Sequence, residues 1–147
     1  MKMGSIYAAM LAVACIGCSG KMPANLGVRE GMLMPCPDKP NCVSTQSDDQ
    51  ANRVNPLTYT TSLGEARIKL VGILASMKRI RIVSEQDNYI HAECRSFLFR
   101  FVDDLECYFD DEGKNIHLRS ASRLGNYDFG VNRRRAEQIR KRFLSND

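Results

Sequence analysis

The chain has 147 residues, of which 44% are hydrophobic and 26% charged, and its formal net charge at pH 7 is +4. This length is enough for one hydrophobic core and too short for two. So small an excess of Lys and Arg does not favour a nucleic-acid-binding protein, and we expect no nucleic-acid partner.

Residues 1–17 have the features of a bacterial signal peptide. A single charge at Lys2 precedes an uncharged, mostly apolar run over residues 6–17, which ends in small residues. A membrane-spanning helix needs roughly 20 apolar residues. The run is shorter than that before the polar Ser19 and Lys21. We therefore expect cleavage rather than permanent anchoring by a helix.

The cleavage zone, Ile16-Gly17-Cys18-Ser19, resembles the lipobox of bacterial lipoproteins, in which a diacylglycerol-modified cysteine becomes the new N-terminus. The resemblance implies lipidation of Cys18 and a membrane tether. Ser19, rather than Asp, implies the outer membrane of a two-membrane bacterium, with the domain facing the periplasm. Cleavage at Cys15 and a soluble periplasmic or secreted product are the alternatives.

Residues 18–55 contain four of the five prolines, the fifth being Pro56, and show no sustained hydrophobic period, which is typical of a tether and a loop. Within them, Cys36 and Cys42 bracket a proline-restricted loop, and in an oxidising compartment such a pair closes to a structural disulfide. A zinc site requires four ligands with closer cysteine spacing, and a redox motif normally has two residues between its cysteines. We accordingly expect no metal and no cofactor.

Residues 56–147 form the predicted domain. Ser62 and Glu65 match a capping box, and apolar residues then recur every three or four positions as far as Lys78, which predicts an amphipathic helix. Alternating apolar residues within 80–82, 90–94, 105–109 and 116–118 predict strands. Residues 97–102 are ambiguous. A second helix is expected over residues 131–144, with Asn132 as its N-cap. The pattern predicts an α+β fold, an antiparallel sheet of about four strands with the N-terminal and C-terminal helices packed on one face.

Several side chains on the predicted strands can carry chemistry. Cys94 and Cys107 fall on inward-facing positions of their strands. We expect them either as buried thiols or as a cross-strand disulfide. His91 and His117 share the outward phase, which predicts that they face solvent or a helix flank. Six carboxylates lie in residues 103–112, whereas residues 119–147 are rich in Arg. This asymmetry has three alternative explanations: a solvated face, a catalytic acid/base pair, or internal ion pairs. The ion pairs would join Asp103, Asp104 or Glu106 to Arg119, Arg123 or Arg134.

Three segments, CPDKPNCVSTQ, DDLEC and RSASRLGNYDFGVNRRRAEQIR, occur in that order. They resemble the family known as domain of unknown function 1499, over roughly residues 32–144. The resemblance implies no established activity. Together with the loop over residues 119–135, whose arginines and free N–H groups can hold an anion, it marks a candidate functional surface: Asn41, Ser44, Asp103, Asp104, Arg119, Ser120, Ser122, Arg123, Asp128, Asn132 and Arg134.

Our first hypothesis is an exported, lipid-anchored envelope protein that acts as a binding or accessory module. Its domain would bind a protein partner or a small anionic ligand at the surface formed by the cysteine loop and the arginine-rich loop. The second hypothesis is a small hydrolase or thiol-dependent enzyme that uses Asp103, Asp104, Ser122 or a free cysteine. The third is a purely structural adaptor.

Overall fold

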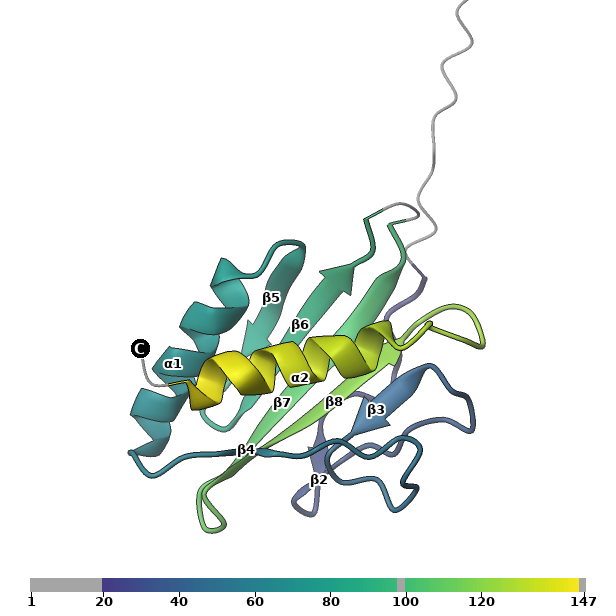
Figure 1. Ribbon diagram of the computed structural model, residues 1–147. Helices are drawn as coiled ribbons and strands as arrows, with labels where there is room; N and C mark the ends of the chain where they lie inside the picture. Colours follow the sequence, from purple (N-terminus) through teal and green to yellow (C-terminus); the bar gives the residue numbers. More distant parts are fainter. Residues whose placement is uncertain (1–19, 98–99, 146–147) are drawn as a thin grey trace, which may run out of the picture.

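The computed structural model describes residues 20–97 and 100–145 (Figure 1). Its main feature is a sheet of six strands in antiparallel pairs, in the order β3-β8-β7-β6-β5, with β4 also paired to β8. Two helices and a small β1-β2 hairpin complete the fold. The bounds are β1 (Val28–Arg29), β2 (Met32–Leu33), β3 (Cys42–Ser44), β4 (Leu57–Thr58), α1 (Leu63–Ser76), β5 (Ile80–Glu85), β6 (Tyr89–Arg95), β7 (Val102–Asp110), β8 (Asn115–Ser122) and α2 (Val131–Leu144).

The α+β class and the antiparallel sheet are confirmed, but the strand count of about four is wrong. The four predicted strands are β5 to β8, and the short strands β3 and β4 bring the sheet to six. Both pair with β8, where Cys42 lies opposite Ala121 and Leu57 lies opposite Ile116. Strands of two or three residues are too short for an alternating pattern to reveal.

The helix α1 begins at the predicted capping box. The Ser62 hydroxyl accepts a hydrogen bond from the Glu65 backbone N–H at 3.3 Å, and the Glu65 carboxylate accepts one from the Ser62 N–H at 3.0 Å. The apolar side chains on one side of the helix, among them Leu70 and Leu74, are fully buried. Fully burying one such side chain contributes about 1.5–3 kcal/mol to folding.

The helix α2 begins differently from the prediction. Its N-cap is Gly130, with φ +73°. The Asp128 carboxylate accepts hydrogen bonds from the backbone N–H groups of Gly130 at 2.9 Å and Asn132 at 2.8 Å. Asn132 itself lies inside the first turn and is completely buried. The prediction of Asn132 as the cap is therefore wrong, because the Asp128 side chain already satisfies the first N–H groups of the helix.

Residues of both helices join one hydrophobic cluster with side chains of the sheet, and Figure 1 shows α2 crossing in front of β6, β7 and β8. The cluster is drawn from residues between Val43 and Phe143. A chain that begins at Ser19 consequently retains the whole cluster. Within the described ranges, neither helix is both long and apolar enough to cross a bilayer.

The other face of the sheet is partly covered by the segment that runs from Gly20 to the β1-β2 hairpin. The Gly27 N–H donates to Glu106 Oε1 at 2.7 Å, and Leu33 is buried. His91, whose side chain points to this face, is only 4% exposed. The prediction that the outward-phase histidines face solvent or a helix flank is thus wrong for His91, because the segment expected to be a tether lies beside it.

Candidate functional site

The three family-like segments meet at one end of the sheet. The strand register places Ile80 opposite Cys94, Asp103 opposite Ser122, and Cys42 opposite Ala121, so that these positions lie at the same end of the strands. The connections at this end of the sheet are residues 36–41, 77–79, 96–101 and 123–130, of which 98 and 99 lie outside the described residues. We refer to this end of the sheet and the described residues of its connections as the loop end.

A pocket of about 320 Å³ opens at the loop end, between the start of β7 and the connection from β8 to α2. Asp103, Ser122 and Asp128, three members of the candidate surface, line it. Most of the remaining lining is apolar. We refer to this cavity as the apolar pocket, and its apolar walls are Phe101, Leu124, Tyr127, Phe129 and Val131.

The backbone of residues 123–130 sets the direction of the two most exposed aromatic walls. Gly125 and Gly130 have φ values of +83° and +73°, a region that favours glycine. Phe129 also has a positive φ, +55°, and its carbonyl accepts a hydrogen bond from Arg134 Nη1 at 2.9 Å. Tyr127 and Phe129 stand edge to face with ring centroids 5.1 Å apart, and their exposures are 61% and 77%.

Sequence reasoning did not assign these aromatic walls to the candidate site, because it treated residues 119–135 as an anion-binding loop. A usable signal was present in the segment NYDFGV, where two aromatic residues alternate with turn-forming residues. Loops run over the protein surface, so large aromatic side chains in them are often exposed. They are therefore candidates for contact with a ligand or a partner.

Asn132 ties the helix to the strand and to the cysteine loop beneath the apolar pocket. Its Oδ1 accepts from the Ser120 hydroxyl at 2.6 Å, and its Nδ2 donates to the Asn41 carbonyl and to Ser122 Oγ, both at 3.0 Å. Asn41 Nδ2 in turn donates to the carbonyl of Gly125 at 2.7 Å. Asn41, Ser120 and Asn132 are therefore framework residues. They position the loop over residues 123–130, which we refer to as the pocket loop.

The acidic run and the arginines form internal ion pairs, as one of the three explanations of the charge asymmetry predicted. Glu106 pairs with Arg119 at 2.6 Å, and Asp104 pairs with Arg123 at 2.7 Å. These two pairs lie on the face of the sheet opposite the hydrophobic cluster. The arginine side chains are only 4% and 5% exposed, so both guanidinium groups are engaged within the protein.

Asp103 pairs with a different arginine from those predicted. Arg135 Nη2 lies 2.6 Å from Asp103 Oδ2, whereas Arg134 is exposed. The helical period explains the exchange, because Arg135 lies on the side of α2 that carries the buried Asn132 and Ile139. Arg134 points away from that side.

Asp104 is the centre of a buried network. It accepts hydrogen bonds from Arg123 and lies 2.8 Å from His91 Nε2, while Arg123 also donates to Glu93 at 2.9 Å. Burial acts to raise the pKa of Asp104, but the hydrogen bonds from Arg123 and His91 outweigh it and lower the pKa. Burial likewise acts to raise the pKa of Glu93, and bonds from Arg81 and Arg123 lower it. These contacts therefore hold both groups as carboxylates.

Among the described residues, the two free thiols, Cys94 and Cys107, are poorly placed to act as nucleophiles. Cys94 lies opposite Asp103, and Cys107 lies opposite Ile90 and Leu118, so the two cysteines are not cross-strand neighbours. Both are free and buried, which confirms the buried-thiol reading. Burial raises the pKa of Cys94 to about 11 and also raises the pKa of Cys107. At neutral pH both remain protonated, which is unfavourable for thiol catalysis.

Ser122 lacks the arrangement of a catalytic serine. Its hydroxyl accepts from Asn132, and it points to the face of the sheet that carries the hydrophobic cluster. His91 and His117 point to the other face, where they contact Asp104 and Thr45. Within residues 20–97 and 100–145, no three His, Cys, Asp or Glu side chains are grouped as a metal site requires.

The cysteine loop is closed as predicted. Cys36 and Cys42 form a disulfide with their Cα atoms 5.7 Å apart. Ser44, two residues further along β3, is 3% exposed, and its hydroxyl accepts a hydrogen bond from the Gln46 N–H. Ser44 lies opposite Arg119, away from the apolar pocket. The structure thus assigns Ser44 to local packing.

A family model described as Protein of unknown function (DUF1499) matches residues 32–143. The matched range includes the disulfide, the network around Asp104 and the whole apolar pocket. The comparisons with curated proteins and with solved structures find no match. Since the match covers most of the chain, the protein belongs to the DUF1499 family.

Proposed function

We propose that the protein is an exported, lipid-anchored envelope protein whose domain is a binding module, and that its ligand is a small apolar molecule held in the apolar pocket. The observation that carries the binding role is the pocket itself. At about 320 Å³ it falls within the size range of small-molecule sites. Its apolar walls and few polar groups also match the usual composition of such sites.

The ligand would enter beside the exposed rings of Tyr127 and Phe129, which pack against each other at the mouth of the pocket. Burying apolar ligand surface against these rings and Leu124 supplies the favourable free energy of binding. Asp103 and Ser122 also line the pocket, and their oxygens can accept hydrogen bonds from one polar group of the ligand. A mostly apolar molecule with a single hydroxyl or amino group fits this arrangement.

The electrostatics favour this ligand over the small anion of our first hypothesis. Arg119 and Arg123 are buried and paired with Glu106 and Asp104. An anion at the pocket would also face the carboxylates of Asp103 and Asp128. Like charges at such short range oppose binding.

Ligand binding can be tested with the unlipidated chain from Ser19 and the apolar fluorophore N-phenyl-1-naphthylamine. We expect saturable binding of one dye molecule per chain, detected as an increase in fluorescence. The variant Leu124→Asp places a charge in the pocket wall and is expected to weaken binding at least about tenfold, because an ionised carboxylate resists burial beside the dye.

The matched control is Ile68→Asp on α1. Ile68 is 73% exposed and lies outside the apolar pocket, so the same substitution there should leave dye affinity unchanged. Circular dichroism checks that both variants keep the fold. Equal affinity of the wild type and Leu124→Asp would show that the dye binds elsewhere, and an absence of saturable binding would contradict the proposal.

Export and anchoring are tested separately by mass spectrometry of the protein expressed in a two-membrane bacterium. We expect a mature N-terminus at Cys18 that carries diacylglycerol, and a mass increase of two hydrogens on reduction, from the Cys36–Cys42 disulfide. The disulfide supports export, because such bonds are rare in the reducing cytosol. Recovery of a chain with Met1 intact and reduced cysteines would overturn this part of the proposal.

A further inference from the structure

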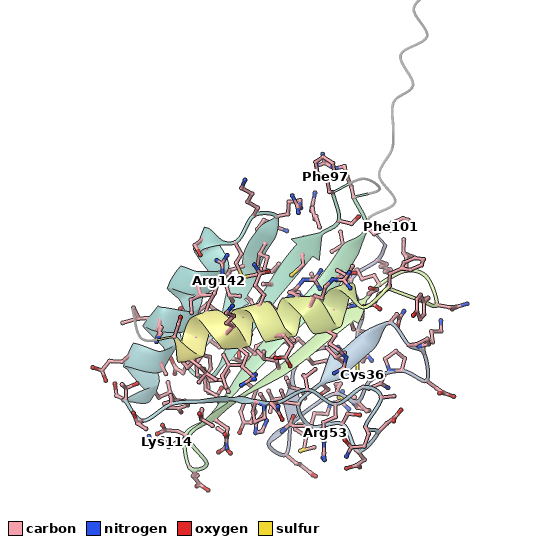
Figure 2. The ribbon with its side chains drawn as sticks, in the orientation of Figure 1. Cys36, Arg53, Phe97, Phe101, Lys114 and Arg142 are labelled. Carbon is pink, nitrogen blue, oxygen red and sulfur yellow. A yellow bond between two sulfur atoms is a disulfide. The ribbon has the colours of Figure 1, made fainter. Side chains whose placement is uncertain are left out.

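Exposed aromatic and basic side chains also gather at the loop end outside the apolar pocket. Phe97 is 80% exposed, and the Arg79 guanidinium lies 5.6 Å from its ring centroid. Figure 2 shows Phe97 and Phe101 at the same end of the sheet, far from Lys114 and Arg53. Phe together with Lys or Arg is a combination found in protein segments that lie in the membrane interface and bind anionic lipids.

A second hollow next to Phe97 is strongly cationic. Its volume is about 320 Å³, and it lies between the start of β5, the end of β6 and the first turns of α2. No carboxylate lines it, and its basic lining residues are Lys78, Arg79, Arg95, Arg134 and Arg135. We refer to it as the cationic groove. Arg100 and Arg81 line an adjoining hollow together with Phe97.

Several of these cations are not neutralised within the protein. Arg135 pairs with Asp103, and Arg95 lies 3.7 Å from Glu93. In the part of the chain that the structure describes, Lys78, Arg79, Arg100 and Arg134 form no ion pair with a carboxylate. The groove therefore presents uncompensated positive charge, which is complementary to the phosphate groups of anionic lipids.

The first described residue of the chain also lies at the loop end. Gly20, the first described residue, packs against Arg123 and Leu124, where an added Cβ would lie 3.0 Å and 3.2 Å from their side-chain carbons. Leu124 is also a wall of the apolar pocket. Two residues span at most about 7 Å. A lipid on Cys18 would consequently enter a bilayer beside the loop end, with no length of tether to separate the two.

We propose that the loop end is a membrane-docking surface whose partner is the headgroup layer of a bilayer that contains anionic phospholipid. Phe97 lies in the interface, and Arg79, Arg100 and the cationic groove contact lipid phosphates. This surface fixes the orientation of the domain and directs the mouth of the apolar pocket towards the membrane. The proposal goes beyond ligand binding, and because it concerns side chains of the folded domain it is tested without a lipid anchor.

The test uses the unlipidated chain from Ser19 and sedimentation with vesicles of phosphatidylethanolamine and phosphatidylglycerol in equal parts, at low salt. We expect binding to these vesicles and much weaker binding to pure phosphatidylcholine. The double variant Arg79→Asn/Arg100→Asn should lower the partition coefficient about 30-fold, because two basic contacts with an anionic surface are lost. Asn suits both positions, since Arg79 and Arg100 have φ values of +65° and +54°.

Phe97→Ser should lower the partition coefficient about tenfold through the loss of apolar burial. The matched control is Lys114→Asn/Arg53→Asn, which removes the same charge at the far end and includes a residue with φ +52°. An unchanged control supports the proposal. The proposal is overturned if the partition coefficient of the control falls as far as that of the test variant, or if the wild type binds phosphatidylcholine vesicles as strongly as the anionic vesicles. It is also overturned if the wild type does not bind vesicles but self-associates, and Phe97→Ser abolishes that self-association. The dye assay contains no lipid, so the two proposals fail independently.

Discussion

Replacement of Arg123 by Met is expected to lower the free energy of unfolding at pH 7 by about 3–5 kcal/mol, measured by urea denaturation with circular dichroism. Arg123 donates to both Asp104 and Glu93 from a side chain that is 5% exposed. Met fills much of the same volume but leaves two buried carboxylates without their shared cation. The loss of this compensation, rather than the loss of attraction alone, gives the large effect.

Two further variants identify the cause. Arg134→Ala removes an exposed arginine whose guanidinium bonds to a carbonyl, and we expect a change within about 0.5 kcal/mol. Arg123→Met combined with Asp104→Asn should be more stable than Arg123→Met alone, because one of the two buried carboxylates that lost Arg123 is also removed. An Arg123→Met variant as stable as Arg134→Ala would contradict the assignment of Arg123 to the structural network.

The pH dependence gives a second readout. The folded-state pKa values of Asp104 and Glu93 are lowered. Their contribution to stability is therefore complete above the unfolded-state pKa values of about 4, and it is lost as pH falls through the lower folded-state pKa values. Arg123→Met should lack part of this contribution. The difference in stability between wild type and variant is therefore expected to shrink as pH is lowered from neutrality into this acidic range.

Replacement of Asn132 by Ala is expected to cost about 3 kcal/mol of unfolding free energy. Asn132 is fully buried and bonds to Ser120, Ser122 and the carbonyl of Asn41, and Ala leaves these buried groups with fewer partners. Because these bonds also hold the loop that carries Gly125 and Leu124, affinity for the fluorophore should fall as well. Urea denaturation and dye titration measure the two effects.

Gln138→Ala provides the control, since Gln138 is exposed on the same helix. Ala has the highest helix propensity, so this variant is expected to be at least as stable as the wild type. If Asn132→Ala were equally well tolerated, Asn132 would not be the link between α2, β8 and the cysteine loop.

The sequence predicted the longer elements well. The capping box at Ser62 located the start of α1, and alternation located β5 to β8, because burial on one face imposes a period that a single sequence displays. It did not predict β3 and β4, whose two or three residues carry no measurable period. It also did not predict the cover over His91, which depends on long-range contacts of the segment near Gly27.

The candidate site was predicted in part. Charge counting anticipated ion pairs between the acidic run and the arginines, and Glu106–Arg119 and Asp104–Arg123 are two of them. It could not show that these arginines are buried, because burial depends on which residues cover each face of the sheet. The aromatic walls of the pocket, including Tyr127, were not assigned, since exposed apolar side chains in a loop have no period.

The disulfide has a consequence for when the pocket loop can form. Asn41, next to Cys42, supplies both the amide that holds Gly125 and the carbonyl that holds Asn132. A newly made chain in a reducing cytosol lacks the cross-link that fixes this residue. We therefore expect the loop that carries Gly125 to be fully fixed only once Cys36 and Cys42 are oxidised.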